Sequence, residues 1–286
     1  MLYFELIVQG VVLGCIYALI AVGLTLVYGL LRVLHVAHAG LFTLGGYIGV
    51  LVTNATGSLL LSIAAAILIV GILGMVIYRL CYHPLLNRPP YVALIASIGL
   101  FIAMEEIYRL AFGPYGLSFA HPPLQQIFSM FGMNLKMAEI AVITIVAVSV
   151  AALHMLAKHT RIGIAWRASV TVPDMAQSFG VDIIRVRYLN FFIASALAAV
   201  AGVMVALLNN LVEPTMGSVP SYKALAIIVL GGLGNVRGTL VASLMLGVLE
   251  SLGTIYLGFL LDRDAIAFVF LIVVLMIRPQ GLFGRA

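Results

Sequence analysis

Charged side chains are scarce in this sequence. Asp, Glu, Lys and Arg together make up 9% of its 286 residues, whereas hydrophobic residues make up 64%. A soluble domain carries about 25% charged residues, which cover its surface. A chain this apolar cannot surround a core with polar side chains, so lipid must be its solvent. The scarcity of charge excludes an ordinary soluble protein and predicts a single membrane domain over residues 1–286.

Cysteine and lysine are also rare, and both shortages exclude kinds of chemistry. The two cysteines, Cys15 and Cys81, stand beside or inside apolar runs, which favours small core residues over a disulfide or a metal site. None of the three lysines follows a glycine-rich G-K-[ST] pattern, so the chain has no phosphate-binding loop. H-E-x-x-H and G-x-S-x-G motifs are missing as well. We therefore expect no catalysis and no cofactor, and any ATP chemistry must come from another chain.

The net charge of +5 comes from scattered Lys and Arg residues without interleaved aromatics, which disfavours nucleic acid as a partner. Basic residues concentrate on the cytoplasmic side of membrane proteins. If 158–187 is cytoplasmic and the chain is traced across the membrane from there, eleven of the 15 basic residues lie on the cytoplasmic side. The other four, Arg109, Lys136, Lys223 and Arg263, lie at or near the outer face. This bias predicts a multi-pass protein of a bacterial inner membrane with a periplasmic N-terminus and a cytoplasmic C-terminus.

Long apolar runs are what the sequence has in abundance. Backbone groups in lipid must be paired within their own segment, so these runs are predicted to be helices. Two runs, 224–236 and 265–277, are only 13 residues long, and such a helix spans about 20 Å of about 30 Å of hydrocarbon. We expect an all-α polytopic transmembrane bundle of about eight to nine membrane segments, with short or broken helices. The runs are 6–31, 39–78 with a turn at 53–58, 91–112, 140–157, 188–212, 224–236, 238–261 and 265–277.

Glycine spacing adds two expectations. Gly10 and Gly14, and Gly45 and Gly49, form small-xxx-small pairs that suit close packing of helices. Residues 10–90 and 222–285 show the same order of segments. In each, an apolar run ends at a glycine-rich break, a second helix and a polar turn follow, and a third helix ends near Arg and Pro. This order predicts a parallel internal repeat, related by an axis normal to the membrane.

The segment 158–187 holds the longest polar stretch, and a short helix is predicted within it. Pro173 is a helix-start residue, Asp174 lies in the first turn, and Gly180 is the stop signal. Met175 and Phe179 are four residues apart and share a face, which suits docking into a groove of a partner. The alternative is a plain loop helix that rests on the membrane. The residues concerned are Pro173, Asp174, Met175, Ala176, Gln177, Ser178, Phe179 and Gly180.

Motifs spread over nearly the whole chain occur in a fixed order. They are 17–23, Tyr28-Gly29, 38–40, Gly163, Arg167-Ala168, Ala176, Gly180-Val181, Arg185, Ala201-Gly202, 230–235, Gly238 and 278–284. This set resembles the permeases of branched-chain amino acid ABC importers, within a wider family that includes ribose-type sugar importers. Trp166 and Ile162 depart from the pattern, since small or polar residues are more usual there. The chain lacks the N-terminal extension of the longer of the two paired permeases, so it resembles the shorter one.

The resemblance implies a function and a set of partners. Two different permeases would form the pore, and two cytoplasmic ATPase subunits would dock on loops such as 161–187. A periplasmic binding protein would deliver the solute. The helix 173–179 would then couple ATP hydrolysis to transport, within a loop that carries Arg161, Arg167 and Arg185. Branched-chain amino acids are the expected solutes, with urea, amides and aromatic acids as alternatives. The rival class, a self-sufficient secondary transporter, has no need of a docking helix in this loop.

Several residues inside or beside the apolar runs are candidates for lining the pathway. A charge at the centre of a span costs at least about 2.5 to 3.5 kcal/mol, so Glu250 must face the bundle interior, as a structural contact or as a pathway residue. His35 and His38 lack nearby carboxylate or thiol partners, which favours a gate lining or a lipid-interface position over a metal site. The candidates are His38, Gly40, Gly231, Gly232, Asn235 and Glu250.

Overall fold

The fold is described from a computed structural model of the chain, which covers residues 2–130, 133–258, 262–278 and 280–283. Seven of its helices are long and apolar enough to cross a membrane, as the sequence predicted. The third of them continues past Ile77 as a π turn, Tyr78–Tyr82, and a 3-10 turn, His83–Leu85. The seven are α1 (Leu2–Leu31), α2 (His38–Thr56), α3 (Leu59–Ile77), α4 (Pro90–Phe112), α5 (Met137–His159), α8 (Ile183–Asn209) and α10 (Val236–Leu257).

Two further apolar helices are shorter, which agrees with the expected short membrane segments. Helix α9 covers Ser218–Gly231 and helix α11 covers Arg263–Ile277, and each lies in a region where the sequence predicted a 13-residue run. At about 1.5 Å per residue they reach little more than 20 Å, less than the hydrocarbon thickness. The structure is therefore an all-α polytopic bundle of long helices supplemented by short ones.

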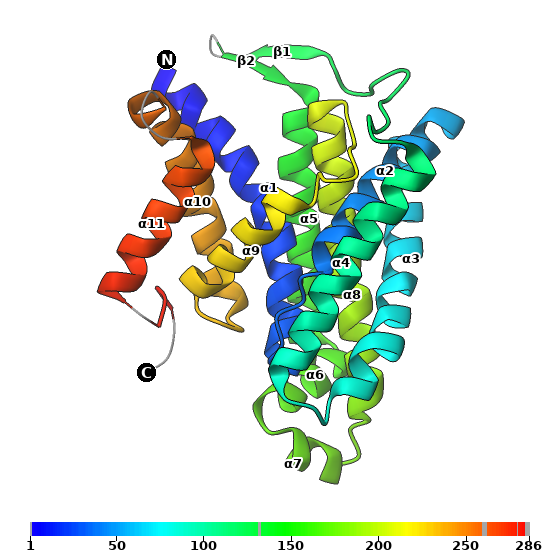
Figure 1. The fold of residues 1–286 in the computed structure, drawn as a ribbon. Helices are drawn as coiled ribbons and strands as arrows, with labels where there is room; N and C mark the ends of the chain where they lie inside the picture. The colour runs from blue at the N-terminus through cyan, green and yellow to red at the C-terminus, as the bar shows by residue number, and fades with distance from the viewer. Residues whose placement is uncertain (1, 131–132, 259–261, 279, 284–286) are drawn as a thin grey trace.

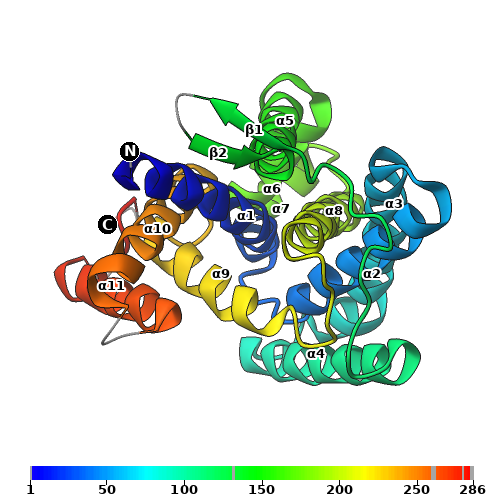
Figure 2. The ribbon, with the colours of Figure 1, turned by 90° about the horizontal axis from the view of Figure 1, so that it is seen from above.

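The centre of the bundle is formed by α1, α2 and α8, while α3, α4, α5 and α11 lie on its outside (Figure 2). Helix α1 is apolar around its whole circumference and almost entirely buried from Val12 to Val27. A helix that is hydrophobic all round is placed inside a bundle. Outer helices instead present large apolar side chains outward, such as Leu110 on α4 and Val148 on α5. These outward faces suit lipid or another membrane subunit.

Both predicted glycine pairs lie at close helix crossings. A Cβ atom on Gly10 would stand 2.7 Å from the Cα of Val248, and one on Gly14 would stand 2.8 Å from the Cα of Leu244, both in α10. On α2, a Cβ on Gly45 would overlap the backbone of Ala199 in α8. Only glycine lets these backbones approach so closely, so the α1–α10 and α2–α8 contacts depend on it.

The two ends of the bundle differ in what they carry. Figure 1 shows the N-terminus and a β-hairpin at one end, and two short helices, α6 (Arg161–Thr171) and α7 (Pro173–Ser178), at the other. The hairpin pairs β1 (Ile127–Met130) with β2 (Met133–Lys136) in antiparallel fashion, and it was not predicted from the sequence. Helices α1, α2 and α3 run in the same alternating directions as α9, α10 and α11 (Figure 1). The internal repeat is compatible with this order and stays a prediction.

Candidate functional site

The most prominent feature at the α6–α7 end is the pair of short helices itself. Helix α6 begins after Thr160, whose hydroxyl accepts a hydrogen bond of 3.0 Å from the backbone N–H of Gly163. It ends at Thr171, because Val172, which precedes Pro173, leaves the helical conformation with a φ of −143° and a ψ of 85°. The sequence analysis did not predict α6. Thr160, a favourable N-cap residue, could have indicated the start of this helix. Polar and apolar residues are mixed in 161–171, however, and the apolar ones do not recur with a clear helical spacing.

Helix α7 begins at Pro173 and ends at Ser178, within one residue of the predicted limits. Gly180 adopts a φ of 82°, a conformation that favours glycine, and the N–H of Val181 donates to the carbonyl of Ala176 over 3.1 Å. This is the hydrogen bonding of a glycine-terminated helix end. Met175 and Phe179 are 60% and 84% exposed, while Ala176 between them is buried. The short helix thus carries two large apolar side chains in contact with solvent.

Helices α6 and α7, with Val172 between them, form a helical elbow, and an apolar groove of about 440 Å³ lies between the two helices. Its walls are mostly aliphatic, and both Met175 and Phe179 belong to them. An exposed apolar groove of this kind commonly marks an interaction site. The lining residues are Arg161, Ile164, Ala165, Ala168, Thr171, Val172, Met175, Ala176, Phe179 and Val181.

The three arginines singled out in this loop do not gather in one place. Arg161 borders the groove. Arg185 forms an ion pair of 2.9 Å with Asp182, the residue that caps the start of α8. Arg167 turns the other way and donates to the backbone carbonyl of Ala157 at the end of α5. Arg161 therefore lies at the groove, whereas Arg167 joins α6 to α5.

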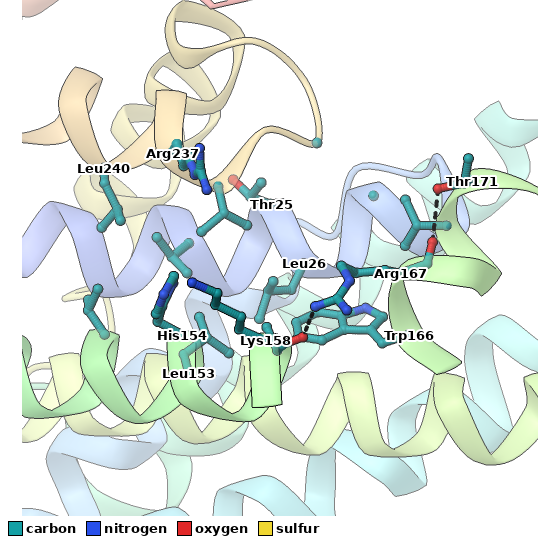
Figure 3. Close-up of a pocket in the computed structure, with 17 residues that line it drawn as sticks. Thr25, Leu26, Leu153, His154, Lys158, Trp166, Arg167, Thr171, Arg237 and Leu240 are labelled. Atoms are coloured by element: carbon teal, nitrogen blue, oxygen red, sulfur yellow. Dashed lines mark hydrogen bonds between the residues drawn. The ribbon is translucent and has the colours of Figure 1, made fainter. Parts of the chain in front are cut away.

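A second cavity of about 540 Å³ lies on the other side of α6, between α1, α5 and the start of α10 (Figure 3). Three cationic side chains line it, Lys158, Arg167 and Arg237, together with the imidazole of His154. Trp166 forms part of its wall next to the backbone where α5 passes into α6. Trp166 was noted in the sequence as a departure from the family pattern, but the cavity was not predicted, because its walls combine the neighbouring helices α5 and α6 with the distant α1 and α10.

Three charged residues meet where α9, α10, α11 and α1 come together. The ammonium of Lys223 lies 3.0 Å from Glu250 Oε2 and 2.9 Å from Asp264 Oδ1. The hydroxyl of Tyr17 donates to Glu250 Oε2 over 2.8 Å, and Tyr222 donates to Asp264 Oδ2 over 2.8 Å. Glu250 faces the interior, as predicted, and is paired there with Lys223. Lys223, which was expected at or near the outer face, lies near the start of α9 and is only 2% exposed because its partners surround it.

The remaining pathway candidates have local roles in this structure. His35 and His38 are both buried, and His35 Nδ1 lies 2.5 Å from the hydroxyl of Tyr82, so the lipid-interface alternative was wrong. Gly40 lies directly against Met104 of α4. In the turn before α10, Asn235 Oδ1 accepts from the N–H of Gly238 over 3.2 Å and caps that helix.

The last two pathway candidates are glycines at the end of α9 and the turn that follows it. Gly231 packs against the backbone of Gly238, and Gly232 has a φ of 96°. Among the described residues that line the 540 Å³ cavity, none is one of the six pathway candidates, although the neighbouring Gly234 and Val236 are present. A role of the six in lining a pathway stays a prediction.

These features define a class of protein. The long apolar helices, the glycine-dependent crossings and the two short helices with an apolar groove at one end describe a multi-pass membrane protein. A family model described as the branched-chain amino acid transport system / permease component matches residues 6–278. The chain belongs to this family.

Curated relatives agree with the family match. The high-affinity branched-chain amino acid transport system permease protein LivH of Escherichia coli is 31% identical, over 99% of this chain and 96% of the relative. The corresponding protein BraD of Pseudomonas aeruginosa is 30% identical over the same shares. The permease LivM of Escherichia coli is 25% identical over 94% of this chain and 68% of the relative. This chain therefore resembles LivH and BraD along their whole length, and LivM more distantly.

Proposed function

We propose that this chain is a permease subunit of an ABC importer that carries branched-chain amino acids across the bacterial inner membrane. The observation that carries the proposal is the family match over residues 6–278, on a fold with seven helices able to span a membrane. The names of LivH and BraD supply the solute class. Urea, amides and aromatic acids remain the alternative solutes.

The energy for transport comes from partner chains in this proposal, and α7 is the element that receives it. This chain has no nucleotide-binding loop, so work has to cross a contact with an ATPase subunit. Support comes from Met175 and Phe179, which are exposed on a helix whose start and end are both fixed by the sequence. Apolar anchors of this kind typically contribute about 1 to 4 kcal/mol to an interface.

The orientation and the other partners follow from the same arrangement. The α6–α7 end faces the cytoplasm, where most of the basic residues were expected, and the end with the β-hairpin and the N-terminus faces the periplasm. A periplasmic binding protein delivers the solute to the hairpin end. A second, different permease completes the pore, a pairing that the two relatives LivH and LivM support.

The direct test is uptake by the reconstituted complex. The chain is purified with its co-encoded permease, ATPase and binding protein, and placed in vesicles that hold ATP. We expect labelled leucine to accumulate only with ATP and the binding protein, and to be displaced by unlabelled isoleucine or valine. Displacement by urea, amides or aromatic acids alone would reassign the solute. Accumulation by this chain without the ATPase would make it a secondary transporter.

A further inference from the structure

The 540 Å³ cavity between α1, α5, α6 and α10 has no role in the proposed function. Lys158 from the last turn of α5, Arg237 from the first turn of α10 and Arg167 from α6 bring three positive charges to it. Among the described residues that line the cavity there is no aspartate or glutamate. Within the described chain, no carboxylate lies at salt-bridge distance from any of the three. The three cationic residues are therefore exposed at the cavity and have no carboxylate partner among the described residues.

The charges and the aliphatic part of the lining can be placed along α5. In Figure 3, the side chain of Lys158 reaches back beside His154 on α5, and Arg237 reaches in from the opposite side at the start of α10. The lining also includes aliphatic residues, with Val22 and Leu26 from α1 and Val150 from α5. From Val150 to His154 the rise along α5 is about 6 Å, so the aliphatic lining next to the charges can take the first few methylene groups of an acyl chain.

We propose that this cavity binds an anionic phospholipid, with the phosphate between Lys158, Arg167 and Arg237 and an acyl chain along α1 and α5. Basic pockets between membrane helices recognise anionic headgroups, and each Lys or Arg near the surface adds to the attraction. A soluble phosphate would satisfy the charges but would leave the aliphatic walls in contact with water. A zwitterionic lipid would cover the aliphatic walls, but its cationic headgroup would lie close to the three positive side chains and be repelled by them. The proposal concerns the isolated chain and is independent of the transported solute.

Trp166 provides the measurement, because it lines the cavity and is the single tryptophan of the sequence. The full chain is reconstituted into zwitterionic vesicles that contain a small mole fraction of brominated lipid, which quenches tryptophan at short range. We expect brominated phosphatidylglycerol to reach half-quenching at roughly a tenfold lower mole fraction than brominated phosphatidylcholine. In the double variant Lys158→Gln/Arg237→Gln the ratio should fall below about twofold.

A matched control removes the same number of charges at the same end of the bundle. Arg79 and Arg88 are exposed beside the turn between α3 and α4 and do not line the cavity. The variant Arg79→Gln/Arg88→Gln should keep the tenfold preference, and so should Lys158→Arg/Arg237→Lys, which preserves the charges and shows that the site tolerates substitution.

Three results would overturn the proposal. Equal quenching by the two brominated lipids would show that the cavity has no headgroup preference. An equal loss of preference in the Arg79→Gln/Arg88→Gln control would assign the effect to the overall surface charge. A shift of Trp166 emission by inorganic phosphate alone, as large as that produced by the anionic lipid, would make the cavity a site for a soluble anion. Because uptake is not measured, failure here leaves the proposed transport function untouched.

Discussion

At the scale of single residues, Lys223 is held between two carboxylates inside the bundle. Its ammonium contacts Glu250, which is fully buried, and Asp264, which is partly exposed. A buried ion pair gives little net stability compared with a well-packed apolar core, but removal of one partner leaves an uncompensated charge. The network therefore joins α9, α10, α11 and α1 into one unit that resists separation.

Substitution of Lys223 by Met should lower stability by about 3 to 5 kcal/mol, because Glu250 is then buried without a cation. The double variant Lys223→Met/Glu250→Gln should recover a large part of the loss, since it removes the unpaired charge. The measurement is the thermal unfolding midpoint of the purified protein in nanodiscs. Lys136→Met, at an exposed lysine of β2, is the control and should leave the midpoint unchanged. A Lys223→Met protein as stable as the control would contradict this role.

The sequence was sufficient to predict that Glu250 faces inward, since an unpaired charge at mid-span is costly. It was not sufficient to identify its partner. Lys223 precedes Glu250 by 27 residues and Asp264 by 41, so only the three-dimensional packing of α9 against α10 and α11 reveals the network. Lys223 was expected at or near the outer face, and its burial between two carboxylates was not predicted.

At the scale of elements, the membrane helices and α7 could be predicted because each has a local signal: a long apolar run, or a proline start and a glycine stop. Helix α6 and the β-hairpin were missed. The hairpin is held by pairing between two short strands, from Ile127 with Lys136 to Met130 with Met133, without an Asn-Gly type of turn signal. The cavities were missed because their walls combine separate helices.

The glycine-dependent crossing of α2 and α8 gives a prediction at this scale. Gly45→Ala should destabilise the protein by about 1 to 3 kcal/mol, because the new methyl group would overlap the backbone of Ala199 and force the helices apart. Gly99→Ala in α4 is the matched control: nothing lies within 4 Å of its Cβ position, and alanine favours helix by about 0.5 to 1 kcal/mol. Thermal unfolding midpoints should therefore shift in opposite directions. Equal shifts would show that the crossing tolerates a Cβ atom.

At the scale of the whole molecule, the arrangement separates two ends with different partners. Labelling of single cysteines tests this directly, in a background where Cys15 and Cys81 are replaced by Ala. We expect Tyr115→Cys, at a residue that is 90% exposed near the hairpin end, to react with a membrane-impermeant maleimide added to intact cells. Asp174→Cys on α7 should react only after the inner membrane is permeabilised. The reverse pattern would invert the proposed orientation.

The central claim is that α7 transmits the work of ATP hydrolysis to this chain, and one variant tests it most directly. Met175→Ala/Phe179→Ala removes the two exposed apolar side chains of the elbow. Leu60→Ala/Leu61→Ala is the control, a pair of similar exposure at the start of α3 near the opposite end of the bundle. Leucine uptake and ATPase co-purification are measured together in vesicles from cells that express the complete importer. The account predicts that the α7 variant inserts normally but loses uptake and retains less ATPase, while the control keeps both. Full uptake with full ATPase retention in the α7 variant would contradict it.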